Sequence, residues 1–151
     1  VLKSWIEEVS EDEMIGRFDA ESGDLYRLIE TAKWLLYASR ELALLLEHKD
    51  LASPISKLMD RVEKGVKSEL LSLVKLEGVG RVRARILYNA GFRSIDDLKG
   101  AQLNQLVNLP LIGPRIAKKI KEQIGGFVRT KDWEKISKAK ESEQQALTEY
   151  Y

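Results

Sequence analysis

The chain has 151 residues, 44% of them hydrophobic and 32% charged, which is enough for one ordinary domain or two small helical ones. It contains no cysteine and one histidine, His48, so disulfide frameworks, thiolate metal sites and Ser-His-Asp triads are all but excluded. The net charge of +1 combines −5 over residues 1–72 (10 Lys and Arg, 15 Asp and Glu) with +9 over residues 73–140 (15 and 6), which predicts two modules, the second with a polyanionic partner.

The first half of the sequence predicts three helices, over residues 2–9, 24–47 and 54–64. The middle helix is the strongest prediction, because its apolar residues recur at helical spacing and Ser-Gly-Asp at residues 22–24 supplies N-terminal signals. Ser53 is the expected N-cap of the third helix, with Pro54 at its first position. His48 is interpreted as an ordinary residue near the end of a helix.

Shorter helices separated by glycine-containing turns are predicted in the second half, over residues 69–74, 81–90, 95–99, 101–108 and 114–124. Gly91 and Gly100 stand where a left-handed residue ends a helix, and Ser94 with Asp97 forms a capping box. We place the modules at residues 1–66 and 67–126, followed by a polar, mobile tail over residues 127–151.

An internal repeat carries the functional information, because residues 73–84 align with residues 106–117 at an offset of 33. Each copy predicts a helix, a tight turn with an apolar residue before glycine, and a second helix. Glycine lets a turn bring backbone N–H groups close to an anion, and the second helix points its N-terminus at the same anion. The chemistry is therefore phosphate capture, with Val79 and Ile112 expected to plug into the core.

This pattern resembles the helix-hairpin-helix motif, and its duplication resembles the two-hairpin domain of DNA repair and recombination proteins. The first copy retains Gly78 and Gly80, whereas Leu111 replaces the first glycine of the second copy, which leaves phosphate binding there open. A helical packing motif that binds no DNA is the alternative for both hairpins.

Basic side chains follow both turns, as phosphate contacts that position a protein without reading sequence require. Arg81 and Arg85 share a helix face, which Arg83 cannot join. The candidate DNA-binding residues of the first hairpin are Gly78, Val79, Gly80, Arg81, Arg83 and Arg85. Those of the weaker second hairpin are Ile112, Gly113, Arg115, Lys118 and Lys119, with Lys121 in the same basic patch. An ordinary solvated surface is the alternative.

Residues 1–125 also resemble the end of archaeal Ski2-like, superfamily 2 DNA helicases, the Holliday junction migration helicases that are similar to the helicase part of polymerase theta. The resemblance rests on Gly-Asp-Leu at residues 23–25, Glu-Thr-Ala-x-Trp-Leu at residues 30–35 and Arg-Ala-Arg at residues 83–85. It implies an all-α fold, with the last helices of a ratchet domain followed by a tandem helix-hairpin-helix domain.

By this resemblance, a long ratchet helix presents Arg27 and Trp34 to a translocating single strand, and Arg83 with Arg85 restrains unwinding like a brake. A core position for Trp34 is the alternative. The family acts as ATP-dependent 3′–5′ helicases in replication-fork repair and recombination. We therefore expect single-stranded, forked or branched DNA and the remaining helicase domains as partners.

The sequence lacks a G-x-x-x-x-G-K-[ST] phosphate loop and an Asp-Glu ATPase box, so ATP and Mg²⁺ are expected in the parent protein and no cofactor in this stretch. Val1 in place of Met indicates a piece of a longer chain. Charged residues among the first apolar ones predict no signal peptide, and an intracellular, nucleoid-associated location is expected.

The last residues resemble the peptide that docks on sliding clamps, with Gln144, Leu147, Tyr150 and Tyr151 at matching spacing. An ordinary amphipathic tail is the alternative. The second hypothesis for the whole chain is thus a protein-interaction module that docks on other domains through its hairpins and recruits a sliding clamp through its C-terminal peptide. A fragment of an RNA helicase stays open as well, because stacking and phosphate contacts do not distinguish the two sugars.

Overall fold

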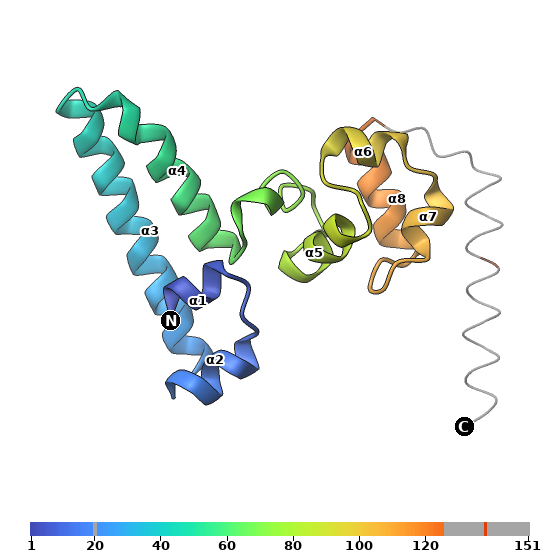
Figure 1. The fold of residues 1–151 in the computed structure, drawn as a ribbon, viewed down its shortest axis with the longest axis horizontal. Coiled ribbons are helices and arrows are strands. Elements are labelled where there is room, and N and C mark those ends of the chain that lie inside the picture. The colour runs from blue at the N-terminus through green and yellow to red at the C-terminus, as the bar shows by residue number, and fades with distance from the viewer. Residues whose placement is uncertain (20, 126–137, 139–151) are drawn as a thin grey trace. The chain divides into compact units, whose positions relative to one another are not determined.

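A computed structural model describes residues 1–19, 21–125 and 138. Within them lie eight α-helices and one short 3-10 helix, with no strand, which confirms the all-α prediction (Figure 1). No helix of this described part is both long and apolar enough to cross a membrane. The chain divides into two compact units, Val1–Leu71 and Ser72–Tyr151.

The first unit is built on two long helices that lie side by side as an antiparallel hairpin (Figure 1). Two short helices, α1 and α2, come before this hairpin, and α1 packs on both of its helices. The helices of this unit are α1 (Leu2–Ile6), α2 (Glu11–Phe18), α3 (Ser22–Leu45), α4 (Lys49–Lys64) and the 3-10 helix η1 (Ser68–Leu70).

Three helices in this unit differ from the prediction. Helix α1 ends at Ile6, and the unpredicted α2 follows, capped by Ser10, whose hydroxyl accepts a hydrogen bond from Glu13 N at 3.2 Å. Helix α4 begins at Lys49 with His48 as its N-cap, so Pro54 lies inside it. Proline there removes one intrahelical hydrogen bond, a cost that the packing of α4 along α3 offsets.

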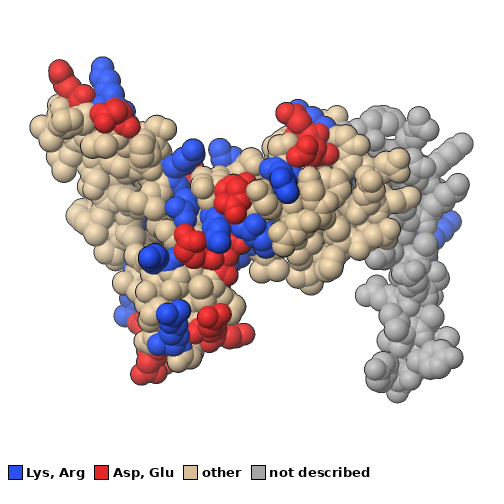
Figure 2. Space-filling view, viewed as in Figure 1, with Lys and Arg blue, Asp and Glu red and all other residues tan. Residues whose placement is uncertain are grey.

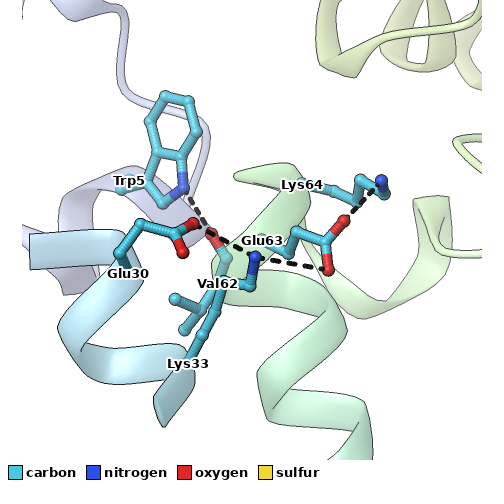
Figure 3. Close-up of polar contacts among 6 residues, drawn as sticks. All are labelled: Trp5, Glu30, Lys33, Val62, Glu63 and Lys64. Atoms are coloured by element: carbon cyan, nitrogen blue, oxygen red, sulfur yellow. Dashed lines mark hydrogen bonds and ion pairs between the residues drawn. The ribbon is translucent and has the colours of Figure 1, made fainter. Parts of the chain in front are cut away.

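Trp5 of α1 is the centre of a small core with Met14 and Leu25. Its indole Nε1 donates a hydrogen bond to Val62 O of α4 at 2.8 Å (Figure 3). Gly65, which ends α4 with a φ of 63°, has no side chain to exclude the indole, since a Cβ there would lie 2.3 Å from the ring. Trp5 is therefore a core residue of this unit.

Polar contacts reinforce the same end of the helix hairpin. Lys33 of α3 lies between Glu30, 3.1 Å away, and Glu63 of α4, 4.0 Å away (Figure 3). The hydrogen bond that Lys33 donates to Glu30 raises the pKa of Lys33, and the hydrogen bond that Lys64 donates to Glu63 lowers the pKa of Glu63. These partly exposed pairs orient α3 and α4 more than they stabilise them.

The segment that leaves α4 is also held to the end of α1. Arg61 donates to Ile6 O at 3.3 Å and forms an ion pair with Glu7 at 3.2 Å. The backbone N–H of Lys67 donates to Glu8 Oε1 at 2.9 Å. Residues at the start of the unit thus fix residues at its end.

Over residues 72–125, the second unit contains four short helices around a core of aliphatic side chains. The helices are α5 (Arg81–Asn89), α6 (Ile95–Gly100), α7 (Leu103–Val107) and α8 (Pro114–Gln123). The fully buried side chains of this core include Leu73, Leu87, Leu98, Leu106, Ile112 and Ile120.

The caps of this unit follow the prediction in part. Ser94 and Asp97 form the predicted capping box, and Gly91 is left-handed with a φ of 96°. Gly100 is not left-handed but is the last residue of α6, because the chain continues from it into an extended Ala101. The helix predicted over residues 69–74 is wrong: a 3-10 helix ends at residue 70 and turns follow.

Candidate nucleic-acid interface

The two hairpin turns have the same backbone conformation. Gly78 and Leu111 occupy equivalent positions of the repeat, and both are left-handed, with φ of 82° and 58°. The glycines two residues later cap α5 and α8 with φ, ψ of −84°, −178° and −73°, 175°. Leu111 in place of glycine therefore raises the conformational free energy of the second turn and leaves its backbone shape unchanged.

Equivalent hydrogen bonds and buried residues fix both turns. Val79 N donates to Leu76 O at 3.0 Å, and Ile112 N donates to Leu109 O at 3.2 Å. Val79 and Ile112 are buried, as predicted, with exposed fractions of 4% and 0%. Each turn is therefore anchored to the core by the residue that stands between its left-handed position and the glycine that caps the next helix.

The helix N-termini behind the two turns differ in their donors. Helix α5 begins with Arg81, whereas α8 begins with Pro114, which has no N–H group. Residues 81–84 and 114–117 contain no acidic side chain that could occupy the positive end of either helix. Both termini suit an anion, and the first offers one donor more than the second.

The arginines of α5 divide into two kinds. Arg83 turns toward the protein, where Nε donates to Leu111 O at 2.8 Å and Nη1 donates to Gly78 O at 3.0 Å. Arg81 and Arg85 are half-buried and one helical turn apart. The Arg85 guanidinium lies 5.1 Å from the centre of the Tyr88 ring, within the range of a cation–π contact.

The basic side chains of α8 also differ in accessibility. Arg115 is exposed, and Lys118 pairs with Glu122 of the same helix at 3.8 Å. Lys121 is not part of the basic surface: it is buried and donates to Leu98 O at 2.8 Å and Lys99 O at 3.0 Å at the end of α6. Burial lowers its pKa. Its place on the apolar face of α8 was the sequence signal for this role.

Glu77 and Gln123, which the sequence analysis did not single out, hold α8 against the first turn. Glu77 N donates to Gln123 Oε1 at 2.7 Å, and Gln123 Nε2 donates to Glu77 O at 3.1 Å. The Glu77 carboxylate also pairs with Lys119. Lys119 is thus engaged within the protein rather than simply presented to a ligand.

On the long helix α3, both predicted contact residues face solvent. The Arg27 side chain is 79% exposed and pairs with Asp24 at 3.4 Å, and Trp34 is 67% exposed. Trp34 therefore does not belong to the core of the first unit. Seven residues apart, the two side chains share the face of α3 opposite its buried residues, Leu25 and Ala43.

Large apolar side chains are exposed along the α3–α4 hairpin as well, among them Leu28, Leu35, Leu42 and Leu45 of α3 and Leu51 and Leu58 of α4. In the space-filling view, charged side chains mark the tip of this hairpin, and the surface below the tip is largely uncharged (Figure 2). This apolar surface of α3 and α4 differs in chemistry from the two basic helix-hairpin-helix copies and suits contact with another protein.

One further prediction finds no test in the described residues. The clamp-like peptide with Gln144, Leu147, Tyr150 and Tyr151 lies outside them. Within them, no group of three or more His, Asp or Glu side chains could hold a metal ion.

Comparison with known proteins relates both units to helicases. Residues 1–65 match the family model for domain 4 of archaeal helicases, and residues 69–125 match that of the SAM-like helix-hairpin-helix tandem. The chain is similar to the ATP-dependent DNA helicase Hel308 of Aeropyrum pernix, with 47% identity over 126 residues, which cover 83% of this chain and 17% of that protein.

The Hel308 proteins of Pyrococcus horikoshii and Thermococcus kodakarensis are each 42% identical, over 130 and 141 residues. These matches cover 85% and 93% of this chain, but 18% and 12% of the relatives. The chain therefore belongs to the Hel308 helicase family and corresponds to its C-terminal region.

Proposed function

We propose that this chain is the sequence-independent DNA-binding region of an ATP-dependent 3′–5′ DNA helicase that acts in replication-fork repair and recombination. The observation that carries the proposal is the pair of turns with one backbone conformation, each followed by a helix whose first turn contains arginine and no acid. Backbone N–H groups and helix dipoles hold phosphates whatever the base sequence is.

The exposed face of α3 supplies a second kind of contact in this proposal. An indole stacks on any base, and a guanidinium contacts the phosphate beside it. Trp34 and Arg27 are both accessible on one side of α3, about 10 Å apart along the helix axis at 1.5 Å per residue. This arrangement supports contact with a single strand rather than with a duplex.

Brake-like control follows from the grip of the hairpins on an emerging strand. A strand that is held by several phosphate contacts must release them at each translocation step, which slows unwinding. Binding and hydrolysis of ATP with Mg²⁺ belong to the rest of the helicase, because the sequence of this chain has no phosphate-loop motif.

The test is a titration of labelled single-stranded DNA, duplex, fork and matched RNA at two salt concentrations. The parent chain is compared with Arg81→Ala/Arg85→Ala, and with Lys57→Ala/Lys99→Ala, which removes two exposed charges that belong to neither copy of the hairpin repeat. We expect salt-sensitive binding that is indifferent to base sequence and weakened by the arginine pair alone. No binding by the folded parent at low salt would refute the proposal.

A second candidate function is protein docking, which the exposed leucines of the α3–α4 hairpin favour. It includes recruitment of a sliding clamp through Gln144, Leu147, Tyr150 and Tyr151. Calorimetric titration of a purified clamp with the parent chain and with a Tyr150→Ala/Tyr151→Ala variant tests this recruitment. Equal binding by both variants would assign any clamp contact to another surface.

A further inference from the structure

We infer that Arg83 is a positioning residue, which sets the place of the second hairpin turn relative to the first and does not itself contact DNA. The inference rests on the proposed DNA-binding function. It assigns to Arg83 a role different from that of Arg81 and Arg85, two residues on either side of it on the same helix.

The bonding of the guanidinium is the first observation. Nε donates to Leu111 O at 2.8 Å and Nη1 donates to Gly78 O at 3.0 Å. These two acceptors are equivalent positions of the 33-residue repeat, and each is the left-handed residue at the tip of its turn. One planar side chain therefore joins the same point of both hairpins.

The repeat partner of Arg83 makes the reciprocal contact. Ile116 stands 33 residues after Arg83, and a Cβ added to Gly78 would lie 3.5 Å from its Cδ1. In each copy, the third residue of the second helix thus lies against the turn of the other copy. The contact from α8 is apolar, and the contact from α5 is polar and directional.

Directional bonding matters because Leu111 is a strained point of the chain. A leucine at a φ of 58° is disfavoured by its Cβ, so local preference alone holds the second turn less firmly than glycine holds the first. The hydrogen bond from Arg83 to the carbonyl of Leu111 fixes this peptide. Loss of that bond loosens the second turn and leaves the first helix N-terminus in place.

Lysine cannot replace this function although it keeps the charge. The guanidinium donates from two nitrogens in one rigid plane, whereas an ammonium is a single centre on a flexible stem. A residue that acts through its charge on a phosphate tolerates lysine, and a residue that bridges two carbonyls does not. The comparison of lysine with alanine therefore separates the two roles.

The experiment measures single-stranded DNA affinity for the parent chain, Arg83→Lys and Arg83→Ala, with Arg85→Lys and Arg85→Ala as the matched pair. Each Arg83 change is also made in the Arg115→Ala/Lys118→Ala background, which lacks the basic contacts of the second hairpin. Thermal unfolding of every variant establishes that it is folded at the temperature of the titration.

We expect Arg83→Lys and Arg83→Ala to weaken binding equally, by about fivefold, because neither makes the bridge. In the Arg115→Ala/Lys118→Ala background, the same changes should weaken DNA binding by less than about twofold. The basic contacts of the second hairpin, which loss of the Arg83 bridge would misplace, are already absent there. Arg85→Lys retains most of the affinity that Arg85→Ala loses.

Two results would overturn the inference. One is that Arg83→Lys binds like the parent while Arg83→Ala does not; the other is that the Arg83 and second-hairpin losses are additive. Either result makes Arg83 a direct phosphate contact. Failure of the parent chain itself to bind DNA would instead reject the proposed function.

Discussion

The two hairpins have one backbone shape and two different sets of side chains. The first has glycine at its left-handed position and arginine at the start of its second helix, and the second has Leu111 and Pro114 at the same places. The first is therefore relaxed and rich in donors, whereas the second is strained and has one donor fewer. Shape is conserved within the repeat because both turns anchor one core, and binding chemistry is concentrated in the first copy.

The largest expected effect concerns the core anchors that give the turns their common shape. Ile112→Ala should lower the free energy of unfolding by roughly 2–5 kcal/mol, because a fully buried aliphatic side chain leaves a cavity. Val79→Ala should cost less, since valine is smaller. Chemical denaturation of both variants measures the difference, and a larger loss for Val79→Ala would show that the first turn is the main anchor.

The second comparison concerns DNA affinity. Arg81→Ala/Arg85→Ala should weaken single-stranded DNA binding on the order of tenfold, and Arg115→Ala/Lys118→Ala by about three- to fivefold. The second effect is smaller because Lys118 already pairs with Glu122 and Pro114 provides no N–H. Fluorescence anisotropy at two salt concentrations checks the order, and equal losses would mean that both hairpins grip the strand alike.

Substitutions at the two left-handed positions should change the stability of the protein in opposite directions. Gly78→Ala should destabilise the protein by about 1 kcal/mol, because an added Cβ finds ordinary packing space but the positive φ disfavours it. Leu111→Gly should stabilise it by roughly 0.5 kcal/mol, after the greater entropy of glycine in the unfolded chain is subtracted. Melting temperatures provide the measurement, and a loss for Leu111→Gly would show that its 63% exposed side chain makes a stabilising contact.

The smallest expected effect belongs to the ion pair that links the hairpins at the surface. Lys119→Met should change stability by less than about 0.5 kcal/mol, because the two side chains are 44% and 73% exposed and solvent screens their attraction. Lys118→Met is the matched control on the same helix. A salt-insensitive loss greater than that of the control would indicate that packing of the Lys119 stem, rather than charge, joins the hairpins.

Much of this arrangement could be predicted from the sequence, and the exceptions have physical causes. The repeat, the long helix and the cap at Ser94 depend on local patterns, and the structure contains them. The predicted start of α4 at Pro54 is wrong, because packing along a neighbouring helix offsets the one hydrogen bond that proline removes. The Ser10 cap corresponds to Ser-x-x-Glu at residues 10–13, a local pattern that marks the start of a helix.

The candidate site shows a different limit. Helix periodicity can place a basic residue such as Lys121 on an apolar face, but it does not identify the groups that the charge contacts. Arg83 and Lys121 both donate to carbonyls of residues more than 20 positions away, which sequence spacing cannot indicate. The Arg-Ala-Arg block thus contains one residue that bonds across the repeat and one beside Tyr88.

The attachment of α1 to the end of α4 has a mechanical consequence. Trp5 bonds to Val62, Arg61 to residues 6 and 7, and Glu8 to the backbone of Lys67, so tension on the connector beyond Gly65 is shared with the start of the chain. Because motion at the base of the α3–α4 hairpin would have to break several of these bonds, we expect the base to be stiffer than the tip. We therefore expect a bending motion of this hairpin to increase in amplitude from α1 toward the turn between α3 and α4.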